Sequence, residues 1–378
     1  YKAKWAAGNR DAQAENFAAL FLDESSANTE TIFARYYKEK FLTHDYDNSV
    51  QPRSTSTGGN DSEVSPTVDF IEMFDGVELD ADGKFGFLDE NGYYKLYDNP
   101  MDAFANAEPR LLGTVILPMS KFKDQYIEIR RGLYTGKVEE GKGISRLIKE
   151  GETAAYETLG LKDVQLTGNF NGGPAVQLKT PYTPYPGATP VTSMLITGLN
   201  GPVNGWNFGN IGGTYLRKYL DPDLENNSGG KSTQHWIDIR YAEVLLNYAE
   251  AKAELGEMDA AVWDQTIAQL RSRAGVTPVV PDKADPYMEA YFLNTVTDKW
   301  ILEVRRERGI ELCLEMGLRW DDDMRWHMGD LLTSDNNPWT GIWIGNTGYT
   351  YDFTGQSTDD NGDPVPDFYI CLLYTSPS

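Results

Sequence analysis

The stretch "HWIDIRYAEVLLNYAEAKAELGE", from His235 to Glu257, indicates the fold class more clearly than any other part of the chain. We interpret it as one helix, because apolar and small residues recur at i, i+3, i+4, i+7 and i+11 along one face. Gly256 then provides the left-handed residue at which many helices end. Arg240 and Glu243 lie beside the apolar stripe, and we predict that they are polar ties within a packed hairpin and contact no ligand. The stripe consists of Ala242, Leu245, Leu246, Ala249 and Ala253.

A second helix is predicted from about Asp259 to Gly275, with Trp263, Ile267 and Leu270 on its buried side. Alanine residues on the first helix let the second approach closely. Two antiparallel helices of this length match a tetratricopeptide-type hairpin of about 34 residues. A third helix is predicted over residues 297–318, leading into "RWDDDMRW".

The rest of the chain has fewer helical signals. Residues 1–47 are predicted to be mostly helical, from "NFAALFLDES" and "TETIFARYYKEKFL", and "VDFIEMF" (68–74) to be a short helix capped by Thr67. Short strands are predicted in "RLLGTVILP" and "YIEIRRGLY", and a hairpin in residues 82–100, where Asn91-Gly92 suits a tight turn. Residues 180–190 and 196–215 are long loops rich in Gly, Pro, Asn and aromatic residues.

These signals predict a mainly α protein, with a tetratricopeptide-like helical scaffold and a loop-rich lobe that contains short β-hairpins. The predicted regions are 1–47, the end of a helical-repeat region; 48–235, the loop-rich lobe; 236–330, the C-terminal helical scaffold; and 331–378, an irregular and truncated end.

The composition is that of a folded protein, with 40% hydrophobic and 24% charged residues among 378. The net charge of −23 argues against nucleic-acid binding, which needs Lys and Arg to neutralise phosphates. No run of about 18 apolar residues indicates a membrane span. Cys313 and Cys371 are too few and too far apart to predict a disulfide framework or a Cys-based metal site.

Familiar catalytic and metal-binding patterns fail on spacing. In "DDDMRWH" (321–327) consecutive acids point in different directions on a helix, so we predict ion pairs with Arg319 and Arg325 rather than a metal site. "SGGKST" (228–233) lacks the glycine that a phosphate loop requires. The acidic turns 78–86 and 357–364 lack the alternating acidic residues that calcium-binding loops require. A single structural Ca²⁺ bound to one of these loops stays an open alternative. We predict no catalytic residue, no metal site and no cofactor.

Four segments, taken in order, resemble the SusD/RagB family of outer-membrane nutrient-binding lipoproteins of Bacteroidetes. They are "SPTVDFIEMFDG", "EPRLLGTVILP", "RYAEVLLNYAEAKAELGE" and "ERGIELCLEMGLRWDDDMRW". Two positions depart from the family pattern: Glu108 stands where Asp is usual and Asp323 where an apolar residue is usual. The family's signal peptide, lipid-modified Cys and closing segment are not visible, so we expect an N-terminally truncated member in which "ICLLYTSPS" is not a native end.

The resemblance implies a non-enzymatic protein on the outer face of the outer membrane. It implies capture of glycans, or of peptides in some members, together with a SusC-like TonB-dependent transporter, and membrane attachment only through a lipid anchor absent from this chain. Sugar C–H faces pack on aromatic rings, and a few polar groups fix their orientation. From loop position and chemistry, the candidate ligand-binding residues are Trp206, Asn207, Phe208, Tyr182, Tyr185, Trp339, Trp343, Tyr349 and Tyr351.

Three alternatives stay open at this point. Each candidate ring could instead pack its own loop onto the scaffold. With 57 Asp and Glu residues, the chain could be a glycoside hydrolase or other hydrolase with an unrecognised carboxylate pair. It could also be a helical-repeat adaptor for protein partners.

Overall fold

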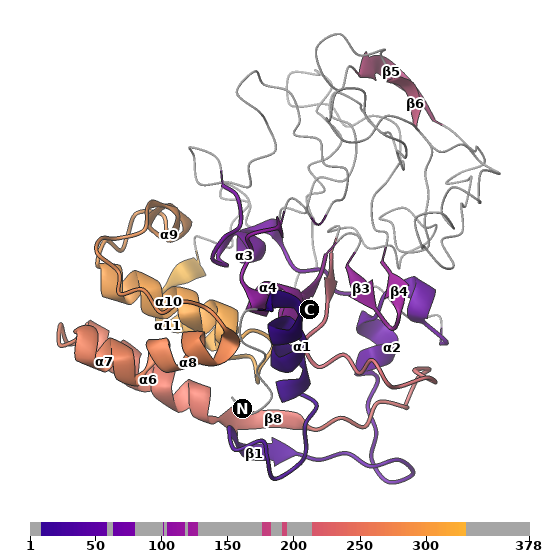
Figure 1. Cartoon of the computed structure of the whole chain (residues 1–378), viewed down its shortest axis with the longest axis horizontal. Coiled ribbons are helices and arrows are strands. Elements are labelled where there is room, and N and C mark those ends of the chain that lie inside the picture. The colour runs from indigo at the N-terminus through magenta and orange to yellow at the C-terminus, as the bar shows by residue number, and fades with distance from the viewer. Residues whose placement is uncertain are drawn as a thin grey trace.

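The computed structural model describes residues 9–58, 63–79, 101, 104–117, 120–127 and 214–329 (Figure 1). Of residues 125, 126, 176–182 and 191–194 it describes the backbone alone. The described part is mainly α-helical with short antiparallel strand pairs, which confirms the predicted fold class. The helices are α1 (Arg10–Leu20), α2 (Tyr46–Val50), α3 (Val68–Glu72), α4 (Pro109–Thr114), α6 (Tyr241–Glu254), α7 (Ala260–Gln265), α8 (Ile267–Ala274), α9 (Pro286–Tyr291), α10 (Lys299–Glu311) and α11 (Leu318–Arg325). The strands are β1 (Thr31–Arg35), β2 (Val115–Ile116), β3 (Lys121–Phe122), β4 (Gln125–Tyr126), β5 (Val176–Tyr182), β6 (Val191–Met194), β7 (Tyr215–Leu216) and β8 (Trp236–Arg240).

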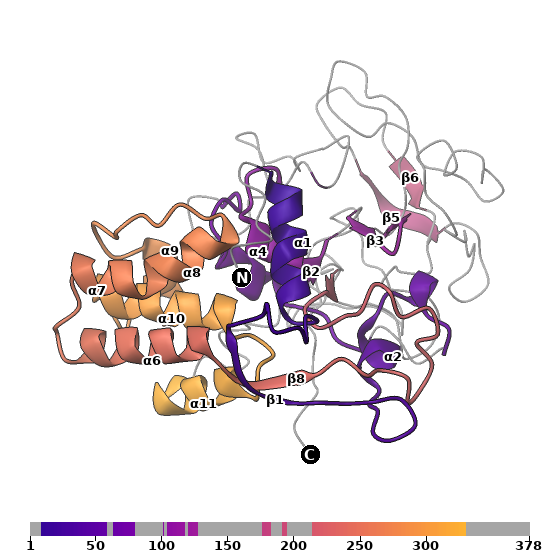
Figure 2. The same ribbon diagram turned by 60° about the horizontal axis from the view of Figure 1, so that its bottom comes forward.

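The predicted helical hairpin is present, and α6 lies beside α7 and α8 in both views (Figures 1 and 2). Ala242, Leu246 and Ala249 are fully buried on its inner face, as their spacing predicts. Gly256 adopts φ +67° at the end of α6, and the Asp259 carboxylate accepts hydrogen bonds from two backbone N–H groups at the start of α7. The sequence signals for both helix ends are therefore confirmed.

The second helix of the hairpin is not continuous, contrary to the prediction. Thr266 (φ −123°, ψ −94°) separates α7 from α8, and its hydroxyl donates to the carbonyl of Val262 at 2.6 Å. The third helix is shorter than the predicted 297–318: α10 ends at Glu311, and Leu314, Met316 and Gly317 all have positive φ before α11 begins at Leu318. The apolar stripe predicts the buried face of each helix of the hairpin but does not reveal the break at Thr266.

Two segments predicted to be helical are strands. Residues 31–35 of the "TETIFARYYKEKFL" segment form β1, and residues 236–240 of the opening stretch form β8. The two strands lie side by side (Figure 1) and pair antiparallel. Ala34 lies opposite Ile237. Tertiary pairing across about 200 residues overrides local propensity here, and no local sequence window could show it.

The α10 helix is buried around most of its circumference, although it carries many charges. Residues 302–311 are all buried, and the helix packs against α6 and α9. The Glu311 carboxylate accepts from the guanidinium groups of Arg240 at 2.8 Å and Arg110 at 3.4 Å, and also from Arg273. These arginines belong to β8, α4 and α8, so one carboxylate ties three distant parts of the chain to α10.

The short α4 helix joins this ion-paired core to α1. The segment "RLLGTVILP" was predicted to be a strand, but Pro109 begins a helix and only Val115 and Ile116 are extended, as β2. Pro suits the first helical position because the N–H that it lacks has no partner there. A Cβ on Gly113 would lie 2.7 Å from the carbonyl oxygen of Ala14, so glycine allows α4 to approach α1 closely.

The predicted domain division at residues 47, 235 and 330 stays a prediction.

Thr67 caps α3, as predicted, and accepts from the backbone N–H of Phe70. The predicted hairpin at 82–100 and the end of the chain, 331–378, lie outside the described residues.

Candidate functional site

The candidate rings lie almost entirely outside the described residues, so their role stays a prediction. Tyr182 ends β5, of which the backbone alone is described. The other candidate ligand-binding residues lie outside the described residues: Tyr185, Trp206, Asn207, Phe208, Trp339, Trp343, Tyr349 and Tyr351.

The scaffold holds the chain firmly on both sides of residues 128–213, the segment that contains several of these candidates. Before it, Ile127 is fully buried and its N–H donates to the carbonyl of Ser120 at 2.9 Å. After it, the Thr214 hydroxyl donates to the carbonyl of Pro66 at 3.1 Å, and Tyr215 is fully buried. The chain therefore leaves the described scaffold at Ile127 and rejoins it at Thr214 through anchored residues.

The carboxylates of the ion-paired core are structural. Glu307 accepts from Arg110 at 2.7 Å and from Arg271 at 2.6 Å. Burial would raise the pKa of Glu307, but these two guanidinium groups lower it below its ordinary value. A glycosidase needs two carboxyl groups that reach a scissile bond. The carboxyl groups of the ion-paired core are buried and paired with arginines, so they do not reach a substrate.

Two of the acids in α11, Asp322 and Asp323, form ion pairs, as predicted. Asp322 accepts from Arg308 at 2.8 Å and from Arg325 at 2.6 Å, and Asp323 lies 3.3 Å from Arg319. Within the described residues no group of His, Cys, Asp and Glu side chains has a geometry that could hold a metal ion. Residues 80–86 and 357–364, of the two acidic turns, lie outside that part.

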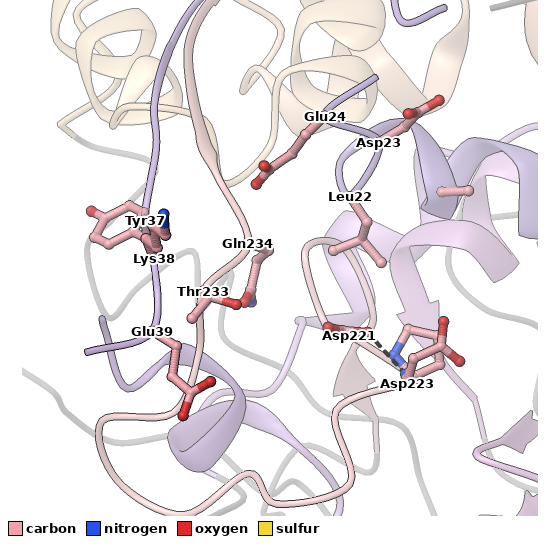
Figure 3. Close-up of a pocket in the computed structure, with 12 residues that line it drawn as sticks. Leu22, Asp23, Glu24, Tyr37, Lys38, Glu39, Asp221, Asp223, Thr233 and Gln234 are labelled. Carbon is pink, nitrogen blue, oxygen red and sulfur yellow. Dashed lines mark hydrogen bonds between the residues drawn. The ribbon is translucent and has the colours of Figure 1, made fainter. Parts of the chain in front are cut away.

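A cavity of about 630 Å³ lies where four separate segments meet, and we call it the acidic cavity (Figure 3). The segments are the end of α1 with the turn after it, the loop after β1, the turn after β7, and the residues that precede β8. The lining residues are Ala19, Leu22, Asp23, Glu24, Tyr37, Lys38, Glu39, Asp221, Pro222, Asp223, Thr233 and Gln234.

Buried polar contacts hold the walls of the acidic cavity in place. The Asp47 carboxylate, 1% exposed, accepts from the backbone N–H of Asp221 at 2.8 Å and from the Gln234 amide at 2.7 Å. The same amide donates to the carbonyl of Tyr219 at 2.8 Å. On the opposite wall, the Tyr37 ring packs edge-on against His44 at 4.5 Å. None of these residues was predicted to be functional, since no local motif marks a site assembled from segments so far apart.

The acidic cavity is strongly negative. Five of its lining residues are carboxylates, namely Asp23, Glu24, Glu39, Asp221 and Asp223, and Lys38 is the one cation among them. Burial raises the pKa of Asp221 above its ordinary value, although a backbone N–H donated by Asp223 opposes this shift. Such a site offers hydrogen-bond acceptors and one aromatic ring to a ligand that is rich in donors.

A second cavity, of about 680 Å³, lies beside the helical hairpin, and we call it the α6–α8 groove. Tyr241 and Tyr248 lie two helical turns apart on α6 and are about half exposed. Leu245 and Leu270 contribute apolar surface, and Gln265 and Gln269 contribute amide groups. This groove is more apolar than the acidic cavity.

Each helix in the described residues is too short or too polar to cross a lipid bilayer.

Comparison with solved structures finds a shared fold, and comparison with family models identifies the family. A solved SusD-like carbohydrate-binding protein from Bacteroides fragilis is 21% identical with a TM-score of 0.53, and the match covers 94% of this chain and 53% of that one. A second SusD-like protein from Bacteroides fragilis is 20% identical with a TM-score of 0.47, covering 84% of this chain and 47% of that one. This chain thus spans about half the length of these solved proteins. No curated protein sequence matches it significantly. The model of the SusD family matches residues 29–368, so the chain belongs to the SusD family.

Proposed function

We propose that this chain is a cell-surface glycan-binding protein that holds oligosaccharides or polysaccharides without cleaving them. In this proposal it is a lipoprotein of the outer membrane that passes its ligand to a SusC-like TonB-dependent transporter. The observation that carries the proposal is the match of the SusD family model to residues 29–368. The fold shared with a solved SusD-like carbohydrate-binding protein supports it.

The physical basis for glycan capture is a rigid scaffold that presents aromatic and acceptor groups. The ion-paired core fixes α4, α8, α10 and β8 to one another. Aromatic rings cover the C–H faces of sugars, and carboxylates accept hydrogen bonds from sugar hydroxyls. In this proposal the loop rings, Trp206 and Trp343 among them, provide the first kind of contact.

Affinity electrophoresis with soluble polysaccharides, combined with an assay for new reducing ends, tests the proposal. We expect retarded migration in at least one polysaccharide and no release of reducing ends. Trp206→Ala and Trp343→Ala should weaken retardation, whereas Trp320→Ala, which removes a half-exposed ring from α11, should not. Released reducing ends would contradict the proposal and support the hydrolase alternative.

The transporter partnership needs a test of its own. We expect a TonB-dependent receptor gene beside the gene for this chain, together with genes for glycosidases. A genome in which no such receptor lies nearby would contradict the partnership but not the glycan binding.

The α6–α8 groove favours a second candidate function, that of a helical-repeat adaptor for protein partners. Half-exposed Tyr241 and Tyr248 give α6 an apolar outer face of the kind that stacks against another helix. For an adaptor, Trp206→Ala would leave partner binding unchanged, and no polysaccharide would retard the chain.

A further inference from the structure

Two of the three histidines in the chain lie where the loop after β1 meets the segment before β8. The three are His44, His235 and His327. We call residues 36–44 the β1 loop, and three of its residues line the acidic cavity. The backbone N–H of His44 donates to the carbonyl of Ser232 at 3.0 Å, and the N–H of Ser232 donates to the carbonyl of His44 at 3.1 Å. This pair of bonds joins the end of the β1 loop to the scaffold, with one imidazole from each segment beside it.

The hydrogen bonds of the His44 ring require a neutral imidazole. Its Nε2 lies 3.0 Å from the carbonyl oxygen of Gln234, which can only accept, so Nε2 carries the hydrogen. Its Nδ1 accepts from the backbone N–H of Tyr46 at 3.3 Å. A proton on Nδ1 would turn this acceptor into a donor and leave two N–H groups facing each other. Protonation of His44 therefore breaks one of the bonds that hold the β1 loop.

The charged groups around His44 do not supply a partner for an imidazolium. The carboxylates next to it in the sequence, Asp45 and Asp47, accept from backbone N–H groups of Gly230 and Asp221 instead. Lys123 also acts on Asp47. Across the junction, residues 228–234 contain one lysine and no acid. Within the described residues, no carboxylate forms an ion pair with the His44 ring.

His235 adds a second imidazole that favours the neutral form. It is 1% exposed, and the Tyr36 ring of the β1 loop stacks on it at 5.7 Å. Burial lowers the pKa of His235 below its ordinary value, and the carboxylates of Glu24 and Asp23 oppose this shift. Glu24 lies 3.4 Å from Nδ1, but its side chain is 41% exposed, so water weakens its attraction. A proton on His235 thus places a charge beneath a ring of the β1 loop, where little water reaches it.

We propose that His44 and His235 make the β1 loop a pH-sensitive element, which is docked when both imidazoles are neutral and released when they gain protons. The released loop binds protons that the docked loop does not. Docking is therefore complete above the ordinary histidine pKa of about 6.5 and weakens as the pH falls below it. Release moves Tyr37, Lys38 and Glu39 away, so one wall of the acidic cavity opens at mildly acid pH.

Hydrogen exchange of single amides, measured by fragmentation mass spectrometry on the full chain, tests the proposal. The reporters are the amides of His44, Tyr46 and Ser232, whose hydrogen bonds form the junction. Rates are corrected for the intrinsic effect of pH, and amides of α6 serve as the internal reference. We expect the protection of the reporters to fall at least about tenfold between about pH 7.5 and about pH 5.5, while that of α6 stays unchanged.

Variants assign the effect to the two imidazoles. His44→Gln keeps one donor and one acceptor without a titrating group, and His235→Phe keeps a ring beneath Tyr36. The double variant should stay protected at about pH 7.5 and lose most of the fall at about pH 5.5. The matched control is His327→Gln, which removes the third histidine, exposed and outside the junction, and should leave the fall unchanged.

Three results would overturn the proposal. The first is equal protection of the wild-type reporters at both pH values. The second is an equal fall in α6, which would indicate general loosening of the chain. The third is the same fall in the double variant as in the wild type, which would assign it to carboxylates such as Glu24. If the double variant is unprotected even at about pH 7.5, the single variants decide, and a full fall in both contradicts the proposal.

Discussion

Replacement of Glu311 by Gln tests the role of the ion-paired core most sharply. Glu311 is fully buried and accepts from arginines of α4, β8 and α8. A glutamine of the same shape removes the charge and turns an N–H₂ group toward guanidinium donors. Removal of one partner from a buried ion pair costs roughly 3–5 kcal/mol, because the remaining charge stays buried without compensation. Against a typical unfolding free energy of about 5–15 kcal/mol, this is a large loss.

Urea denaturation at pH 7, followed by tryptophan fluorescence and circular dichroism, measures the effect. With a slope of about 3 kcal/mol per molar urea, the denaturation midpoint should fall by about 1 M or more. The matched control is Glu257→Gln, which removes an exposed carboxylate paired with Lys252 and should leave the midpoint unchanged. A shift for Glu311→Gln no larger than that of the control would refute the structural role that we assign to the core.

Three further predictions concern the same scaffold. The arginines around Glu311 overcome the effect of burial and hold its pKa below the ordinary value of 4.5, so its stabilisation is complete above that pH and is lost as pH falls through the folded-state pKa. The urea midpoint of the wild type should therefore decline below about pH 4.5 more steeply than that of Glu311→Gln, and parallel declines would contradict this. Gly76 and Gly256 both have positive φ, but a Cβ on Gly76 would lie 1.9 Å from the carbonyl oxygen of Asn106, whereas one on Gly256 meets nothing within 4 Å. Gly256→Ala should cost about 1–2 kcal/mol and Gly76→Ala distinctly more in the same urea assay, and the reverse order would be inconsistent with this geometry. Asp259→Ala removes the acceptor for two N–H groups of α7 and should cost about 1 kcal/mol, seen as a lower melting temperature, whereas Asp259→Asn should retain most of the stability.

Local signals in the sequence predict the helical hairpin well, because its determinants lie within one or two turns of each other. Gly256 and Gly275 adopt the left-handed conformation at the helix ends, and Asp259 caps α7. The same local reasoning fails for β1 and β8, whose extended form depends on pairing between residues such as Ala34 and Ile237. It also fails for the break at Thr266, which a continuous apolar stripe conceals, and for the end of α10 at Glu311.

Charge is the feature that sequence reasoning predicts least well. The pairing of Asp322 and Asp323 with Arg319 and Arg325 follows from i, i+3 and i, i+4 spacing and is confirmed. The contacts of Glu311 with arginines of three distant segments do not follow from any spacing. The acidic cavity cannot be predicted from local spacing either, because each of its four segments contributes only a few residues. The loop rings were chosen from their loop positions and their chemistry, and they remain predictions.

The central claim is that the chain binds glycans without cleaving them. The length of an oligosaccharide before and after binding tests this claim most directly. A polysaccharide that retards the chain in affinity electrophoresis is first cut into oligosaccharides of known length. These oligosaccharides are incubated with the chain, and the complex is separated from the unbound oligosaccharides. Denaturation of the chain then releases the bound oligosaccharides. Mass spectrometry then measures the length of the bound and unbound oligosaccharides. We predict that the bound oligosaccharides are recovered at their original length and in a saturable amount. Shortened products, or the same recovery from a denatured control, would contradict a protein that binds glycans without cleaving them.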